Sequence, residues 1–295
     1  MLTAQDFLVS KENKERIISD YIDTVLSVRL DALNPHVFFI GGQPASGKSH
    51  LINVVQSQLP HSFAVDSDEL RLRHPQINEI VRQDPLRMDV LSNEPVGEWF
   101  RASIDKATQY RENIIIENSF TQSQVLINEA QRLSNEGYSV HFMVIAAPEE
   151  VSRLGVVKRY KDGVENNGLA RWAAQSSHDN AVRKIPTVVA EILRSEVVPQ
   201  VLVTTRDQRI STVLNRPEET EKVFAHLRQQ VLTPNVVAAW KKTYAQCAGF
   251  FLARGLVTSY TQPTLSQLHS DAEKLLFPHE LPAEHRELGQ KLAAL

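Results

Sequence analysis

The chain has 295 residues, 42% of them hydrophobic, and its 32 basic and 35 acidic side chains give a net charge of −3. This content is enough for one large domain, or for one domain with a smaller appendage. No apolar run reaches the ~18 residues of a spanning helix, and the first residues are too charged for a secretory signal. No basic run is long enough for a nucleic-acid or membrane surface, and Cys247, the only cysteine, cannot form an intrachain disulfide. We therefore expect a soluble, cytoplasmic protein that binds neither nucleic acid nor membrane.

A leading helical segment is predicted over residues 6–33, where apolar side chains recur at mostly helical spacing before Pro35. After it, short apolar runs alternate with helix-length stretches. The predicted strands cover residues 36–40, 62–65, 113–117, 139–146 and 198–205. The predicted helices between them cover residues 48–59, 96–111, 123–137 and 147–160. This alternation indicates an α/β fold with a mostly parallel sheet flanked by helices on both faces.

The last part of the chain has a different pattern, because strand-like runs stop after residues 208–214. Three helical stretches follow at residues 218–232, 235–256 and 264–276, with breaks at Pro234 and around Pro263. The pattern predicts one domain over residues 1–213, with its leading helix within residues 1–34. Residues 214–295 are predicted to form a C-terminal helical extension.

Residues 37–52, VFFIGGQPASGKSHLI, run an apolar strand candidate into a glycine-rich loop and then into a helix. Gly42, Gly47, Lys48 and Ser49 satisfy the pattern G-x-x-x-x-G-K-[ST] in the context that this pattern requires. Glycines let backbone N–H groups face a phosphate at a helix N-terminus, a lysine reaches the outer phosphates, and a serine hydroxyl can hold Mg²⁺. An ordinary strand-to-helix turn is the alternative, but three of only 11 glycines fall in this loop. The stretch predicts a P-loop NTPase-like nucleotide site.

The predicted nucleotide-binding residues are the whole loop and the first turn of the helix after it, with Ser49 as the metal ligand. They are Gly42, Gln43, Pro44, Ala45, Ser46, Gly47, Lys48, Ser49 and His50. A P-loop alone does not name the reaction, because switches, motors and small-molecule kinases all use one.

Acidic side chains follow two of the predicted strands. Asp66 and Asp68 come after the second strand, at the edge where open α/β sheets gather their ligands. A carboxylate there could accept a hydroxyl proton, or could simply cap the helix that follows. Glu117 ends the apolar run NIIIE, and could bind a substrate hydroxyl or Mg²⁺, or pair with an arginine.

Phosphoryl transfer also needs cations against the charge on the transferred group, and arginines usually supply them. Arg159 closes a predicted helix, and Arg171 lies in residues 166–179, a stretch predicted to be loop-like with the flexibility of a lid. A solvated helix face is the alternative for either side chain.

Taken in order and spacing, five stretches resemble the zeta toxin family of P-loop kinases: GGQPASGKS, AVDSDELRLRHP, IIIENSF, LGVVKRY and ARWAAQSSHD. The resemblance covers roughly residues 36–210. It implies a phosphotransferase-like α/β fold and ATP- or GTP-dependent phosphorylation of the 3′-hydroxyl of UDP-N-acetylglucosamine, which blocks cell-wall synthesis. It also implies an antitoxin protein that covers the cleft, or inhibition in cis by the terminal helices.

The same resemblance implies a role for each matching residue. Lys48 and Ser49 would bind the triphosphate and Mg²⁺, and Asp68 rather than Asp66 would be the base on the acceptor hydroxyl. The remaining matches are Glu117 and Ser119 as sugar-nucleotide contacts, Arg159 and Arg171 as catalytic arginines, and the pair His178 and Asp179.

The chain departs from the family pattern on the acceptor side. Thr121 stands where the family has a substrate-contacting arginine, and Arg101 stands where it has a glutamate, with Glu98 one turn away. These departures favour an alternative in which a kinase of the same fold uses another acceptor, such as a nucleotide, NAD or an antibiotic. A non-catalytic nucleotide-dependent switch is the second alternative. The extension has no counterpart that the sequence resemblance places, and could shape the acceptor site, hold a partner or restrain the enzyme.

Overall fold

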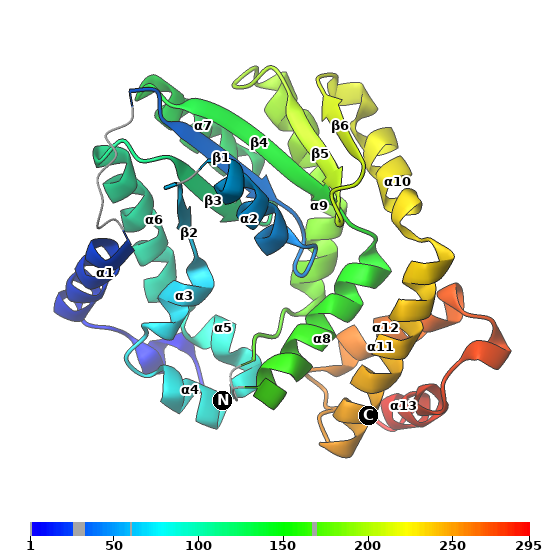
Figure 1. Cartoon of the computed structure of the whole chain (residues 1–295). Helices are drawn as coiled ribbons and strands as arrows, with labels where there is room; N and C mark the ends of the chain where they lie inside the picture. The colour runs from blue at the N-terminus through cyan, green and yellow to red at the C-terminus, as the bar shows by residue number, and fades with distance from the viewer. Residues whose placement is uncertain (1, 26–32, 60, 167–169) are drawn as a thin grey trace.

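The computed structural model describes residues 2–25, 33–59, 61–166 and 170–295. Within them the chain forms a six-stranded sheet in the order β2-β3-β1-β4-β5-β6, in which only β6 is antiparallel to its neighbour (Figure 1). The strands are β1 (His36–Gly41), β2 (Phe63–Val65), β3 (Ile114–Asn118), β4 (Ser139–Ala146), β5 (Val201–Thr205) and β6 (Ser211–Leu214). The five predicted strands and the predicted fold class are thus confirmed, and β6 lies within residues 208–214.

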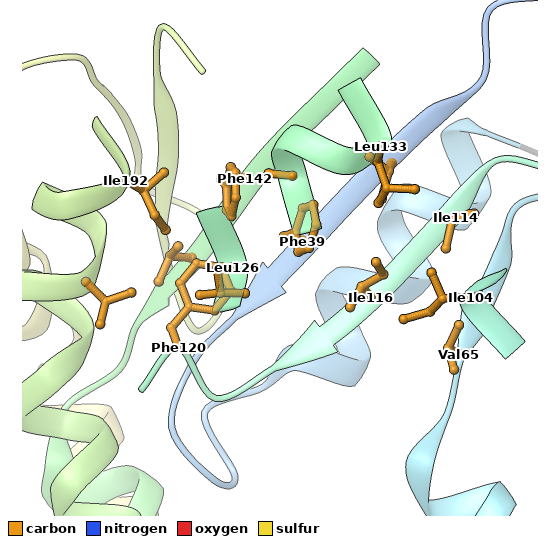
Figure 2. Packing of buried hydrophobic residues seen from close by; sticks show 14 of the residues in the cluster. Phe39, Val65, Ile104, Ile114, Ile116, Phe120, Leu126, Leu133, Phe142 and Ile192 are labelled. Atoms are coloured by element: carbon orange, nitrogen blue, oxygen red, sulfur yellow. The ribbon is translucent and has the colours of Figure 1, made fainter. Parts of the chain in front are cut away.

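One face of the sheet carries the main hydrophobic core. Phe39 of β1 stacks on Phe142 of β4, with ring centroids 4.7 Å apart, and Ile114 and Ile116 of β3 continue the same layer (Figure 2). The helices that pack on this face are α6 (Asn93–Gln109), α7 (Ser123–Asn135), α9 (Gln175–Arg194) and α10 (Thr220–Val231). The near-continuous apolar strands are explained by this burial, because a parallel sheet is covered on both sides.

The other face of the sheet is covered by α2 (Lys48–Gln58), which follows the glycine-rich loop. Leu51 and Val55 of α2 pack on Ile40, Ile115 and Ile145 of the three central strands. This packing fixes the position of the loop between β1 and α2 at the carboxyl edge of the sheet.

The predicted leading helix is two elements, η1 (Ala4–Phe7) and α1 (Lys11–Val25), and residues 26–32 of that prediction lie outside the described residues. Tyr21 is buried in the main core, and the indole N–H of Trp99 in α6 donates to the Lys14 carbonyl at 3.1 Å. The segment therefore packs against α6, on the β2 side of the sheet (Figure 1).

Short helices that follow β2 and precede α6 in the sequence lie at the carboxyl edge of the sheet (Figure 1). They are α3 (Ser67–Leu72), α4 (Ile77–Gln83), η2 (Pro85–Arg87) and α5 (Met88–Leu91). Ile80, Met88 and Leu91 form a small core with Phe7, which anchors this layer to η1.

A second large core joins α8 (Glu149–Asn166) to the last three helices, α11 (Pro234–Ala253), α12 (Gln262–Leu275) and α13 (Ala283–Ala293). Tyr160 of α8, Phe251 of α11 and Leu288 of α13 are among its members. Helix α10, joined to β6 through η3 (Pro217–Glu219), instead packs Phe224 and Leu227 into the main core. No helix among the described residues is long and apolar enough to cross a membrane.

Candidate active site

The loop between β1 and α2 is closed by hydrogen bonds from the side chain of Lys48 to its backbone. Lys48 Nζ donates to the carbonyls of Gly42 and Gln43, at 2.8 and 3.1 Å. A Cβ atom at Gly42 would lie 2.3 Å from Ser46 Oγ, and Gly47 has φ of +107°, so both positions require glycine. The hydroxyl of Ser46 is buried and has no hydrogen-bond partner among the described residues. The loop thus forms a tight cradle with a polar atom left for a ligand.

Lys48 also faces the end of β3. Its Nζ lies 3.5 Å from Glu117 Oε1, and the lysine side chain is 10% exposed against 37% for the glutamate. Burial lowers the pKa of Lys48, Glu117 opposes this shift, and the positive charges of Arg171 and Arg159 add to it. The predicted lysine, glutamate and arginines therefore lie close enough to act on one another electrostatically.

Two cavities adjoin at this point. The smaller, about 580 Å³, is lined by residues 45–49 of the loop together with part of α8. The larger, about 850 Å³, is lined by parts of α6 and α7 and by the residues that end β3. Lys48, Glu117, Arg159 and Arg171 line both cavities. A cavity at the glycine-rich loop on one side and a larger cavity on the other, with charged side chains between them, suit transfer of a group between two bound molecules.

Some of the remaining residues of the predicted nucleotide site line one of the two cavities, and others are buried or exposed away from them. Pro44 lines the larger cavity, whereas Ser49 lines the smaller one. Gln43 is fully buried, and His50 is exposed on the first turn of α2. Ser49, the predicted metal ligand, is exposed at the start of α2.

Asp66 and Asp68 occupy different positions at the start of α3. Asp66 Oδ1 accepts the Glu69 N–H at 3.3 Å, so Asp66 is the N-cap of the helix and the capping alternative holds for it. Asp68 is the second residue of α3, and its side chain lies outside what the structure describes. Its neighbour Ser67 lines the larger cavity, which places the start of α3 at the cavity wall.

The turn after β3 presents Ser119. Asn118 Oδ1 accepts the Phe120 N–H at 2.8 Å, Phe120 has φ of +50°, and its ring is buried edge-on against Phe142 (Figure 2). Ser119 lines the larger cavity, and its Oγ lies 3.4 Å from Thr121 Oγ1. The buried ring of Phe120 holds this strained turn in place, which the sequence did not indicate.

Arg171 is held by an acidic residue of the short-helix layer. Its Nε lies 2.5 Å from Asp89 Oδ2, and the two side chains are 31% and 19% exposed. Asp89 also faces Arg71, whose Nη1 donates to the Asp89 carbonyl at 2.9 Å and to Ser92 Oγ at 2.7 Å. The segment around Arg171 is irregular only as far as residue 174, because α9 begins at Gln175, so the predicted loop is shorter than expected.

His178 and Asp179 belong to a buried network rather than to a cavity wall. His178 is 1% exposed, with Nε2 2.8 Å from Ser152 Oγ and Nδ1 2.8 Å from Asp179 Oδ1. Burial lowers the pKa of His178, so the neutral ring is favoured. The pair therefore has a structural role here.

A family model described as Zeta toxin matches residues 21–219, about two thirds of the chain. The chain belongs to the zeta toxin family. The sequence is 24% identical to Toxin zeta of Streptococcus pyogenes over 285 residues, which cover 95% of this chain and 90% of the relative. It is 24% identical to Toxin PezT of Streptococcus pneumoniae serotype 4 over 200 residues, which cover 67% of this chain and 78% of the relative.

Solved structures confirm the same fold. A chain from "Molecular and structural characterization of the PezAT chromosomal toxin-antitoxin system" of Streptococcus pneumoniae superposes with a TM-score of 0.71 at 17% identity, covering 82% of this chain and 98% of that chain. A match to Toxin zeta of Streptococcus agalactiae, 23% identical, covers 100% of this chain and 94% of the relative, and so includes helices α10 to α13. The match therefore extends over the C-terminal extension, for which the sequence resemblance placed no counterpart.

Membership in the zeta toxin family supports a kinase-like toxin, and two arginines that the sequence analysis did not name also line these cavities. Arg206, directly after β5, donates from Nη1 to the Ala45 carbonyl at 2.6 Å and lines the smaller cavity. Arg71 lines both cavities. The position of Arg206 at the carboxyl end of a predicted strand was a signal for it, whereas Arg71 lies in a short helix with no such signal.

Arg101 of α6 lines the larger cavity, at the position where the family resemblance expects a glutamate. Glu98 does not replace that glutamate, because it pairs with Lys14 at 3.0 Å and is absent from the lining of both cavities. The larger cavity thus has a guanidinium where the family resemblance implies a carboxylate.

Proposed function

We propose that this chain is a small-molecule kinase that transfers the γ-phosphoryl group of ATP or GTP to the 3′-hydroxyl of a UDP-amino sugar, UDP-N-acetylglucosamine in the first place. The observation that carries the proposal is the meeting of two cavities at Lys48, Glu117, Arg159 and Arg171. A switch needs the smaller cavity alone. A kinase needs a second site for its acceptor, with charged groups at the junction.

On the nucleotide side, the loop residues hold the phosphates. The tight turns at Gly42 and Gly47 and the unpaired hydroxyl of Ser46 fit a bound triphosphate. Ser49 would hold Mg²⁺, which when bound supplies positive charge against the phosphate oxygens. Lys48 adds a cation from within the cradle.

On the acceptor side, Asp68 accepts the proton of the acceptor hydroxyl as that oxygen bonds to the γ-phosphorus. The bond from the γ-phosphorus to the bridging oxygen breaks in the same step, and the nucleoside diphosphate leaves. Arg159 and Arg171 offset the charge of the transferred group. Glu117 and Ser119, both on the wall of the larger cavity, orient the sugar hydroxyls.

An antitoxin partner is part of the proposal. The PezAT structure belongs to a toxin–antitoxin system by its own description. In this chain, no described residue before Phe39 or after Arg206 lines either cavity. The described terminal helices do not cover the cleft, so inhibition would come from a separate protein in the cytoplasm.

The test is an assay of purified protein with ATP or GTP and Mg²⁺ over UDP-sugars, NAD, nucleosides and aminoglycosides, with products read by mass spectrometry. The proposal expects a phosphorylated UDP-amino sugar. Transfer to another acceptor instead would favour the alternative kinase, for which Arg101 in the acceptor cavity and Thr121 in place of the family arginine argue. Tight nucleotide binding with no transfer to any acceptor would identify a switch and contradict the proposal.

A further inference from the structure

A buried ion pair joins the C-terminal helices to the catalytic domain. Arg153 of α8 donates from Nη1 to Asp271 Oδ2 of α12, and the two side chains are 3% and 0% exposed. Removing Asp271 would leave the buried guanidinium of Arg153 with less compensating negative charge, which is unfavourable. The position of α12 is therefore coupled to that of Arg153.

From Arg153 the contacts continue toward α9. Its Nη2 donates to Asp179 Oδ1 at 3.2 Å, and the same oxygen lies 2.8 Å from His178 Nδ1. With the proton on Nδ1, His178 Nε2 accepts from the Ser152 hydroxyl at 2.8 Å. Each group thus has a partner on both sides, which fixes the rotamers along the series.

The series ends at the glycine-rich loop. Gln43, which is fully buried, donates from Nε2 to Ser152 Oγ at 3.3 Å and to the Ala147 carbonyl at 2.8 Å. The backbone carbonyl of Gln43 in turn accepts from Lys48 Nζ at 3.1 Å. We call the series the buried polar chain, and its members in order are Asp271, Arg153, Asp179, His178, Ser152 and Gln43.

We infer that helix α12 positions the glycine-rich loop through the buried polar chain, so that the C-terminal helices are a required part of the nucleotide site. The inference rests on the proposed function only in taking this loop as the nucleotide cradle. Asp271 is a positioning residue, since it acts through Arg153 and touches neither cavity.

Helix α8 explains why the geometry of the site depends on this anchor. It carries Arg153 in the buried polar chain and Arg159, which lines both cavities, about 9 Å further along the helix axis. The second core, with Tyr160 on Phe251, attaches the same helix to α11. A shift of α12 would therefore move the loop and the cavity arginine together.

The alternative role for the extension, inhibition in cis, lacks the contact it needs. Residues 214–295 are all described, and none of them lines either cavity. The extension contacts the site through the buried side chains of the buried polar chain, and not through the walls of the two cavities.

The test compares Asp271→Asn with Glu273→Gln, the same carboxylate-to-amide change two residues along α12 on a side chain that is 57% exposed. Binding of a fluorescent ATP analogue is measured without acceptor, so the result does not depend on any transfer reaction. We expect Asp271→Asn to weaken nucleotide binding about tenfold, because the carboxylate charge opposite Arg153 is lost. Glu273→Gln should bind as the wild type. Wild-type affinity in a folded Asp271→Asn protein would overturn the inference.

Circular dichroism and thermal melting would show whether Asp271→Asn is folded. A second variant keeps the test possible if it is not. Asp179→Asn breaks the buried polar chain at a side chain that is 22% exposed, and it should weaken nucleotide binding in the same direction. The double variant Gln43→Ala with Asp271→Asn should bind nucleotide about as weakly as whichever single variant binds it more weakly, because both substitutions interrupt the same buried polar chain. Fully multiplicative losses in that cycle would contradict a shared path.

Discussion

Lys48 Nζ and Glu117 Oε1 lie 3.5 Å apart, which joins the glycine-rich loop after β1 to the end of the neighbouring strand β3. The sequence left three roles open for Glu117. This contact adds a fourth, in which the carboxylate balances the positive charge of the buried Lys48. Because Glu117 also lines the acceptor cavity, one side chain adjoins both proposed substrates.

This contact makes Glu117→Gln informative. The amide keeps the shape of the side chain but removes the charge that opposes the lowered pKa of Lys48. We expect the KM for the acceptor to rise about tenfold, because the charge of a proposed acceptor contact is lost, with a smaller loss of nucleotide affinity through Lys48. Steady-state kinetics with each substrate varied in turn would measure both effects. A loss confined to nucleotide affinity would contradict the acceptor role.

Asp66 and Asp68, two residues apart around the first residue of α3, offer a matched pair of variants. Asp68→Asn should abolish transfer and leave ATP affinity near that of the wild type, because the proposed base touches the acceptor alone. Asp66→Asn keeps an N-cap of similar strength, and should retain turnover and stability. Single-turnover rates and equilibrium ATP binding would distinguish the two. If Asp68→Asn lost ATP binding as well, Asp68 would belong to the metal site instead.

Arg171 is predicted to act on the transition state. Arg171→Ala should lower kcat by about 10³-fold, because an arginine that offsets the transferred charge contributes that much in other phosphoryl transfers. Asp89→Asn should lower kcat less, since it removes the partner that orients Arg171 and not the cation itself. The measurement is kcat at saturating substrates, and a change of only a few-fold in Arg171→Ala would count against a catalytic role.

A pH effect on stability is expected from His74. Its Nε2 lies 3.1 Å from the Phe7 carbonyl and its Nδ1 accepts the Gln76 N–H at 3.1 Å, so the ring fits only when neutral. Burial lowers the pKa of His74 below 6.5. The unfolded chain then binds the proton first, so the free energy of unfolding falls as the pH drops below 6.5, by up to about 1.4 kcal/mol per pH unit.

Urea unfolding of the wild type and of His74→Gln at pH 7.5, 6.5 and 5.5 would measure this contribution. The glutamine cannot take up a proton, so the free energy of unfolding of the variant should depend less on pH in this interval. Equal pH dependence for the two proteins would show that His74 does not contribute.

Much of the fold could be predicted because buried parallel strands leave a plain apolar signal. The P-loop could also be predicted, because its residue pattern lies between an apolar strand candidate and a helix, the context that the pattern requires. Helix α9 was not predicted, although Ala181, Ile185, Val188 and Ile192 have helical spacing, because Pro186 lies in its interior. That proline is accommodated within a helix whose apolar face is buried in the main core.

The site was predicted less completely, because its supporting contacts depend on tertiary structure. Nothing in the local sequence relates Asp89 to Arg171, or Asp271 to Arg153, which are joined only when separate helices pack. Phe120 is a similar case, because its left-handed conformation depends on a core pocket beside Phe142. Local pattern indicated residues that line the two cavities better than the residues that hold those side chains in place.

The burial of Cys247 has a practical consequence. It is the single cysteine of the chain, it is 0% exposed in the second core, and burial raises its pKa to about 12. A maleimide dye will therefore not label the native protein. Asn128, exposed on α7 at the wall of the larger cavity, could be replaced by cysteine to give one reactive thiol. A fluorophore attached there would report acceptor or antitoxin binding without any background that needs to be engineered away.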